Sequence, residues 1–210
     1  MDEVDGNFIG KCLPIINHPK CRFLDGIQMF GWRPNPSLSE DDNYMDMVML
    51  VTRSSHCSQG SMACVLVDQS SDGFFESIIS VATNKPLFTD KDSDVHAEIA
   101  ALGGASRRGD RTENATAYIT MPPCKRCFAA LVVSGIRRIV TRLAPPKAIE
   151  EGARRHKIEL VVLGRLKEQT ARLNTLIYGN PDGKRKKIDE GSETSGPLKR
   201  RKSQEESSEK

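Results

Sequence analysis

Short apolar stretches alternate with helix signals along most of this chain, and that alternation limits the folds open to it. A helix expected at 39–51 is followed by two apolar runs, 62–67 and 77–82, which predict a hairpin of strands. Helices and strands then alternate to about residue 177. This order favours a mixed α/β sheet with parallel later strands and helices on both faces. Such sheets place their sites at the C-terminal ends of strands.

The later elements share simple cues: an apolar run marks each strand, and a cap, proline or glycine marks the helix ends. The expected strands are 115–120, 136–141 and 158–163, and the expected helices are 122–134, 147–155 and 166–177. A further helix is expected to begin at Val95, with Asp94 as its cap. Its end is left open by the adjacent Gly103 and Gly104.

Both ends of the chain are poor in core material. Apolar residues make up 38% and aromatic residues 5% of the 210 residues, which is low for a purely globular chain. Residues 1–38 are interrupted by prolines and predict an irregular N-terminal extension. Residues 179–210 hold few aliphatic side chains and predict a disordered basic tail. The folded domain is therefore expected at 39–178.

The ends also hold the signals for location. The N-terminus is acidic and lacks an apolar run, so we expect no signal peptide, and no run approaches the roughly 20 apolar residues that span a membrane. Two basic clusters within 184–202 suit a nuclear import receptor, which predicts a cytoplasmic or nuclear protein. The formal net charge of +3 is nearly balanced, so a nucleic-acid partner is not favoured.

Two short motifs at expected helix starts indicate the chemistry: H-A-E at 96–98 and P-C-K-R-C at 123–127. Taken singly they are modest, because a CxxC pair is also typical of redox pairs and buried thiols. Together they are far more specific. Cys124 and Cys127 lie three apart on one helical turn and can direct both sulfurs to one point. His96 can reach the same point from its own helix.

One imidazole and two thiolates suit zinc, which binds such ligands tetrahedrally and keeps its fourth position for water in catalytic sites. Zinc can lower the pKa of bound water to roughly 7 and so make hydroxide available. His96, Cys124 and Cys127 are therefore the expected zinc ligands. Glu98 is too close along the chain to be the obvious fourth ligand. A carboxylate beside zinc can take a proton from water and return it, so we assign Glu98 the role of catalytic acid and base.

The H-x-E and P-C-x-x-C motifs resemble those of the cytidine deaminase superfamily. The resemblance spans roughly residues 42–163. It implies a three-layer α/β/α sandwich with a five-stranded mixed sheet, and one catalytic zinc. It also implies a hydrolase that acts on the C–N bond of a cyclic amidine and releases ammonia. Members of the superfamily often assemble, so a homo-oligomer is expected.

Within the superfamily, the chain is most similar to the deoxycytidylate deaminases. The stretches that show this similarity are 44–47, 52–55, 63–67 and 134–140. The resemblance implies that Asn84, after the second strand, holds the sugar of the substrate, and that Ala97 also belongs to the substrate site. It predicts an enzyme of nucleotide and pyrimidine metabolism that converts a cytosine nucleotide such as dCMP to the uracil nucleotide.

Departures from that pattern keep alternatives open. The family's asparagine two residues after the catalytic glutamate is Ala100 here, and its glycine-rich phosphate segment is replaced by residues 85–88. Residues 96–102 also resemble tRNA adenosine deaminases, although the glutamate that those proteins carry before Pro-Cys is Pro122 here. A non-catalytic partner that keeps zinc for structure is a further alternative, against which the retained Glu98 argues. The exact nucleotide, any allosteric effector and the assembly stay open.

The remaining cysteines raise the question of a second, structural zinc, which some relatives have. The candidate ligands would be Cys12, His18, Cys21, Cys57 and Cys64, but their irregular spacing favours packing or free thiols. We therefore expect a single zinc ion.

Overall fold

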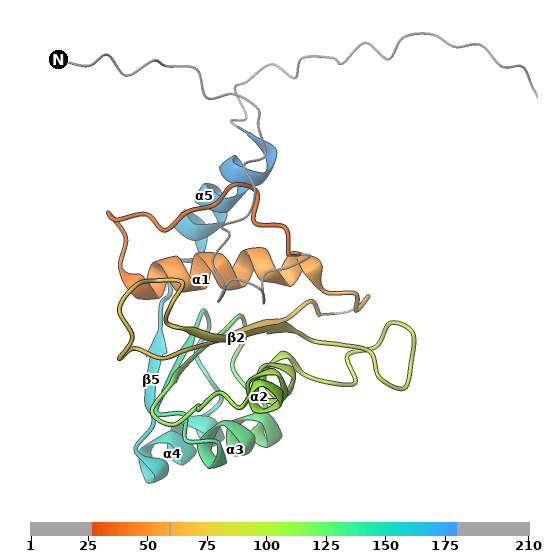
Figure 1. The fold of residues 1–210 in the computed structure, drawn as a ribbon, viewed down its shortest axis with the longest axis vertical. Coiled ribbons are helices and arrows are strands. Elements are labelled where there is room, and N and C mark those ends of the chain that lie inside the picture. Colours follow the sequence, from red (N-terminus) through yellow and green to blue (C-terminus); the bar gives the residue numbers. More distant parts are fainter. Residues whose placement is uncertain (1–26, 59, 180–210) are drawn as a thin grey trace, which may run out of the picture.

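A five-stranded sheet lies between two layers of helices in the computed structural model, which describes residues 27–58 and 60–179 (Figure 1). The strands are β1 (Ala63–Val67), β2 (Ile78–Thr83), β3 (Thr116–Ile119), β4 (Arg138–Thr141) and β5 (Glu159–Val162). The helices are α1 (Glu40–Val51), the short 3-10 helix η2 (Thr52–Ser54), α2 (Ala97–Arg108), α3 (Lys125–Val133), α4 (Lys147–His156) and α5 (Leu166–Tyr178). In Figure 1, α1 and α5 lie on one side of the sheet, and α2, α3 and α4 on the other. The expected three-layer α/β/α sandwich with a mixed sheet is confirmed.

The strand order is β2-β1-β3-β4-β5, and the strand directions decide where the chain leaves the sheet. β1 pairs antiparallel with both β2 and β3, so these two strands run in the same direction, whereas β3, β4 and β5 are parallel to one another. Thr83, at the end of β2, pairs with Ala63, and Ile119, at the end of β3, pairs with Cys64. The segments that follow β2 and β3 therefore leave at the same edge of the sheet, with β1 between them.

The layer of α1 and α5 covers one face of the sheet with an apolar core. α1 begins after Ser39, whose Oγ accepts a hydrogen bond from the backbone N–H of Asp42 at 3.1 Å, as the sequence predicts. Tyr44 stacks on Phe74, with ring centroids 4.0 Å apart, and its hydroxyl donates to the Phe74 carbonyl at 2.9 Å. The buried side chains of this core include Met45, Met47, Val48, Leu50, Val51, Val65, Val67, Tyr118 and Val140.

α2 lies close to the opposite face of the sheet because four of its five buried residues are alanine or glycine. Ala97, Ala101, Gly104 and Ala105 are buried, and α2 packs on β1 and β2. A Cβ atom on Gly104 would lie 2.8 Å from the Oγ of Ser80, so this position has no room for a side chain. The larger apolar side chains of this second core include Leu66, Ile119, Phe128, Leu131 and Ile139.

The start of α2 differs from the sequence expectation. The helix begins at Ala97 with His96 as its N-cap, not at Val95, and the prediction that Asp94 caps it is wrong. Asp94 instead accepts hydrogen bonds from the backbone N–H groups of residues 87–89. The physical reason is that the loop before α2 folds back on Asp94 and offers its carboxylate closer donors than the helix does.

Two further helix boundaries, the end of α2 and the start of α3, can be compared with the sequence expectation. α2 continues through Gly103 and Gly104 and ends at Gly109, which has a left-handed φ of 76°. Burial of the helix against the sheet outweighs the poor helix propensity of the two internal glycines. Pro122 and Pro123 precede the N-cap residue of α3, Cys124, and do not form its first turn.

The predicted irregular extension at 1–38 and basic tail at 179–210 fall largely on residues 1–26 and 180–210, which lie outside the described residues. Those predictions, including the import-receptor clusters, are therefore not tested by the structure. Within the ranges that the structure describes, no helix is long and apolar enough to cross a membrane.

A partly buried ion pair ties α1 to the middle of the sheet. Arg138 on β4 donates to both carboxylate oxygens of Asp41 at 2.7 Å, and the Tyr118 hydroxyl donates to the same carboxylate at 2.8 Å. Burial raises the pKa of Asp41, but these hydrogen bonds and the Arg138 charge outweigh it, so the net pKa is lowered. The two side chains are only 18% and 21% exposed, so removal of one partner would leave a poorly solvated charge and cost more than the loss of a surface pair does.

Replacement of Arg138 with methionine is expected to lower the free energy of unfolding by about 1–3 kcal/mol, because the Asp41 carboxylate loses its main partner. A carboxylate with a lowered pKa contributes stability above its unfolded-state pKa, and this contribution is lost as the pH falls through the folded-state pKa. The difference between the wild-type protein and Arg138→Met should therefore be full at pH 7 and shrink below about pH 4. Urea unfolding at a series of pH values measures it.

Glu159→Gln provides the control for that experiment. The Glu159 Oε1 lies 3.2 Å from the Arg138 Nε, but the Glu159 side chain is 63% exposed. Its loss is expected to change the free energy of unfolding by less than about 0.5 kcal/mol. If both variants lost the same free energy of unfolding, the conclusion that Asp41 is the main partner of Arg138 would be wrong.

Candidate metal centre

Two helix starts meet at the edge of the sheet where β2 and β3 end. His96 is the N-cap of α2 and Cys124 is the N-cap of α3, and both have an extended backbone, with ψ angles of 152° and 167°. Cys127 lies in the first turn of α3, where its backbone N–H donates to the Cys124 Sγ at 3.5 Å. The structure thus brings together, from two helices, the three residues that the sequence predicts as metal ligands.

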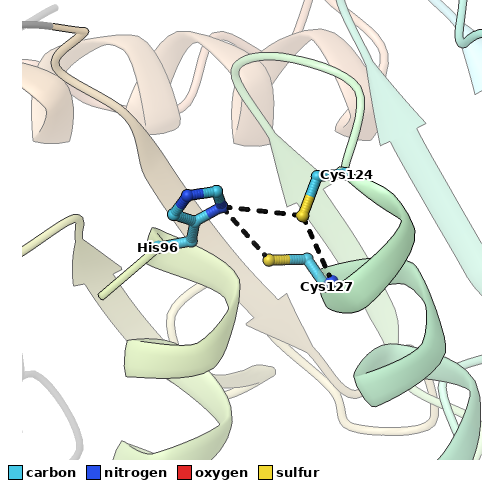
Figure 2. Close-up of side chains that lie close together, drawn as sticks. All are labelled: His96, Cys124 and Cys127. Atoms are coloured by element: carbon cyan, nitrogen blue, oxygen red, sulfur yellow. Dashed lines mark hydrogen bonds between the residues drawn. The ribbon is translucent and has the colours of Figure 1, made fainter. Parts of the chain in front are cut away.

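Each of the three side chains directs one donor atom to a common point (Figure 2). The His96 Nδ1 lies 3.4 Å from the Cys127 Sγ and 3.8 Å from the Cys124 Sγ, and all three donor atoms lie within 4.8 Å of one another. A nitrogen and a sulfur bound tetrahedrally to one zinc ion are about 3.5 Å apart. The observed spacing therefore fits a single zinc ion, and so does the donor set of one imidazole and two thiols.

The other cysteines do not join this group. Cys57 is buried elsewhere and donates to the Asp92 carbonyl at 3.4 Å, and Cys64 is buried in β1. Cys12 and Cys21 lie outside the described residues, so the expectation of a single zinc ion stays a prediction.

The metal centre is open on one side and buried on the other. His96 and Cys124 are exposed, whereas Cys127 is 2% exposed and Glu98 is 5% exposed. A molecule that approaches from solvent therefore meets the imidazole and the outer sulfur first. Glu98 lies deeper, next to the inner sulfur.

Glu98, in the first turn of α2, has a carboxyl group set between the metal centre and β1. It lies near the Cys127 side chain and its own backbone N–H, and both favour its charged form. Burial raises the pKa of Glu98, and these two groups and the His96 charge oppose only part of that rise. Cys64 on β1 is also affected by Glu98: burial, and then the Glu98 charge, raise the pKa of the Cys64 thiol. A carboxyl group with a raised pKa is suited to accept a proton and release it again.

The pKa of Cys127 differs from what the helix position predicts. A helix N-terminus lowers the pKa of a nearby thiol, so the position of Cys127 in the first turn of α3 would by itself favour the thiolate. In the structure, burial and then the neighbouring Glu98 charge raise the pKa of Cys127 above its ordinary value. Burial dominates here because Cys127 is almost entirely shielded from solvent. Metal binding at Cys127 therefore has to displace a firmly held proton.

Asn84 lies directly after β2, as predicted, but its amide is fully used by the protein. Its Oδ1 accepts hydrogen bonds from the Ser55 Oγ at 2.8 Å and the Met62 backbone N–H at 3.0 Å. Its Nδ2 donates to the Gly60 carbonyl at 3.0 Å and the Ser93 Oγ at 2.9 Å. A substrate contact by Asn84 stays a prediction, and it requires that one of these bonds be exchanged.

Ala97, the other predicted substrate residue, is buried between His96 and Glu98 at the start of α2. Its contact with a substrate likewise stays a prediction. Its small side chain has a visible structural role, since it belongs to the core under α2.

The loop between Asn84 and His96 is fixed by contacts that the sequence does not signal. Lys85 and Val95 exchange two backbone hydrogen bonds of 2.9 Å each. The Asp94 Oδ2 accepts bonds of 2.8–3.1 Å from the backbone of residues 87–89, and these bonds, led by the one from Leu87, lower the pKa of Asp94 to about 2. Sequence reasoning missed these roles because they depend on the path of the loop.

Comparison with known sequences points to one family. A family model described as the cytidine and deoxycytidylate deaminase zinc-binding region matches residues 38–143. A deoxycytidylate deaminase of Enterobacteria phage T2 is 42% identical over 48 residues, which cover 23% of this chain and 26% of the phage protein. A tRNA-specific adenosine deaminase of Buchnera aphidicola is 41% identical over 69 residues, which cover 32% of this chain and 45% of that protein. The chain thus matches less than half the length of either relative.

Comparison with solved structures supports the same fold. A dCMP deaminase from the cyanophage S-TIM5 superposes with a TM-score of 0.51 at 18% identity, covering 62% of this chain and all of the phage chain. A guanine deaminase from Nitrosomonas europaea gives a TM-score of 0.51 at 18% identity, covering 81% of this chain and 98% of that one. At this identity the likeness concerns the fold alone.

Replacement of Cys124 with alanine is expected to reduce the zinc content of the purified protein from about one ion per chain to well below half, because two donors bind zinc far more weakly than three. Cys57→Ala is the control: it removes a cysteine from outside the site and should leave the zinc content unchanged. Elemental analysis of both proteins after dialysis measures the ratio. Full zinc content in Cys124→Ala would show that the metal is bound elsewhere.

Proposed function

Since the chain belongs to the cytidine and deoxycytidylate deaminase family, we propose that it is a zinc-dependent hydrolase that deaminates a cytosine nucleotide such as dCMP. Family membership gives the reaction class, a hydrolytic deamination that breaks a C–N bond. The observation that supports catalysis by this chain is the buried Glu98 carboxyl beside the point where His96, Cys124 and Cys127 converge. The similarity to the phage deoxycytidylate deaminase supports the choice of a cytosine nucleotide.

Deamination of a cytosine ring replaces an amine with an oxygen. A C–O bond forms at the ring carbon, the C–N bond to the exocyclic amine breaks, and the amine leaves as ammonia. Of the two protons of the consumed water, one ends on the ring nitrogen and the other on ammonia. A zinc ion, when bound, makes water reactive as a nucleophile at neutral pH.

Glu98 is placed to move those protons. Its buried carboxyl lies on the inner side of the metal centre, near the Cys127 side chain. It can take a proton from water, hold it because burial raises its pKa, and release it to the ring nitrogen or to the leaving amine. His96, Cys124 and Cys127 then have the separate task of holding the metal.

A base within a nucleic acid is the second candidate substrate. The match to the tRNA-specific adenosine deaminase is longer than the match to the phage protein, and the exposed His96 and Cys124 leave the site accessible to a large molecule. The nearly balanced net charge of +3 gives little attraction to a polyanion. Pro122, in place of the glutamate expected for tRNA deaminases, also favours the free nucleotide.

Glu98→Gln is expected to keep about one zinc ion per chain and to lose about 10²–10⁴-fold in kcat, because an amide cannot shuttle a proton. Glu150→Gln is the matched control, since Glu150 is an exposed first-turn acid on α4 and should leave kcat unchanged. Ammonia release, zinc content and melting temperature are measured for both. A Glu98→Gln protein that keeps most of its turnover would refute the assignment.

A substrate panel tests the finer proposal. Purified protein is assayed for ammonia release from dCMP, CMP, dCTP, deoxycytidine and guanine, and for inosine formation in tRNA. We expect turnover of a free cytosine nucleotide, with kcat/KM at least about tenfold above that of the nucleoside, which corresponds to about 1.4 kcal/mol. Inosine formation in tRNA without turnover of any free cytosine nucleotide would instead favour the second candidate.

A further inference from the structure

The amide of Asn84 joins three chain segments beside the metal centre. Asn84 is 1% exposed, and its hydrogen bonds reach Ser55 after η2, Gly60 and Met62 before β1, and Ser93 before α2. We call this set of bonds the Asn84 brace. A buried amide with both donors and both acceptor positions satisfied is a rigid connection, because any displacement leaves a polar group unpaired.

One side of the Asn84 brace holds the segment that leads into the metal ligand. Ser93, whose hydroxyl accepts from the Asn84 amide, lies three residues before His96. Between them, Val95 is held by its two backbone hydrogen bonds with Lys85, the residue next to Asn84. Two of the attachments of this segment, at Ser93 and at Val95, therefore lead back to the end of β2.

His96 depends on this approach for its position. Within the described part of the chain, the hydrogen-bond contacts of its ring are the two sulfurs, at 3.4 and 3.8 Å. His96 is exposed, and its side chain makes no capping bond to α2. In the part of the chain that the structure describes, no hydrogen bond other than these two contacts orients the exposed imidazole, so the backbone path into His96 largely sets where Nδ1 points.

We propose that Asn84 is a positioning residue for the zinc ligand His96 and acts through Ser93. This role rests on the metal centre of the proposed function but not on its substrate. It differs from the sugar contact that the sequence predicts, because it places the effect of Asn84 on metal binding rather than on nucleotide binding. The two roles therefore separate in experiments that measure zinc without turnover.

The test compares Asn84→Ala, Ser93→Ala and Ser55→Ala. The serine variants are matched, since each removes one hydroxyl bonded to the Asn84 amide, but only Ser93 lies in the segment that enters His96. Zinc affinity is measured by competition with a chelating dye, and ligand geometry by the visible spectrum of the cobalt-substituted protein. We expect zinc affinity to fall about 10–100-fold in Asn84→Ala, clearly in Ser93→Ala, and less than about twofold in Ser55→Ala. The cobalt spectrum should shift in the first two variants only.

A general loss of stability is separated from positioning by Arg138→Met, which destabilises the fold far from the metal centre. If Arg138→Met weakens zinc binding as much as Asn84→Ala does, the positioning role is wrong. It is also wrong if Asn84→Ala keeps its zinc affinity and cobalt spectrum while only KM for the nucleotide rises. Should Asn84→Ala fail to fold, the serine pair decides: equal zinc affinities in Ser93→Ala and Ser55→Ala would overturn the proposal. Absence of deaminase activity in the wild-type protein would count against the proposed function and leave these zinc measurements valid.

Discussion

The antiparallel pairing of β1 with both of its neighbours is the constraint on which the metal centre depends. β2 leads into α2 and β3 leads into α3, and only because both strands run opposite to β1 do the two helices start at one edge of the sheet. The register matters as much as the direction. A slip of one residue between β1 and β3 would move the end of β3 by about 3.3 Å and reverse its faces. Such a shift is as large as the 3.4 Å between the His96 Nδ1 and the Cys127 Sγ.

Small residues determine how closely the helices that carry the metal ligands pack against their neighbours. Gly104 has no room for a Cβ beside Ser80, so α2 lies as close to the sheet as its backbone permits. Gly152 sets the spacing between α3 and α4, since a Cβ there would lie 2.9 Å from the Phe128 ring of α3. A larger residue at Gly104 would push on α2, and one at Gly152 would push on α3, and these are the two helices that carry the metal ligands. The geometry of the metal centre thus depends on the close packing of the core.

Much of this arrangement could be predicted from the sequence, because local physics determines it. Apolar runs and helix signals predicted the five strands and the start of each α-helix to within about three residues, and the two motifs identified His96, Cys124 and Cys127, which the structure brings together. The contacts that the sequence did not reveal have a common cause. The bonds from residues 87–89 to Asp94 depend on the path of one loop, whereas the bonds of Asn84 and the raised pKa of Cys127 depend on segments that meet only in the folded chain. Residue type and spacing carry no information about such contacts.

The uneven exposure of the metal centre has a consequence for the medium in which the reaction occurs. His96 and Cys124 face water, so the polarity around the reacting ring is set on that side by whatever molecule covers them. Glu98 and Cys127 already lie in surroundings of low polarity, where an electrostatic interaction is stronger than in water. A ligand that covers the exposed side completes this low-polarity enclosure with its own surface. The bound molecule thereby forms part of the environment in which it reacts. A molecule that covers the site poorly lets water in, and the electrostatic interactions that act on it are then weaker.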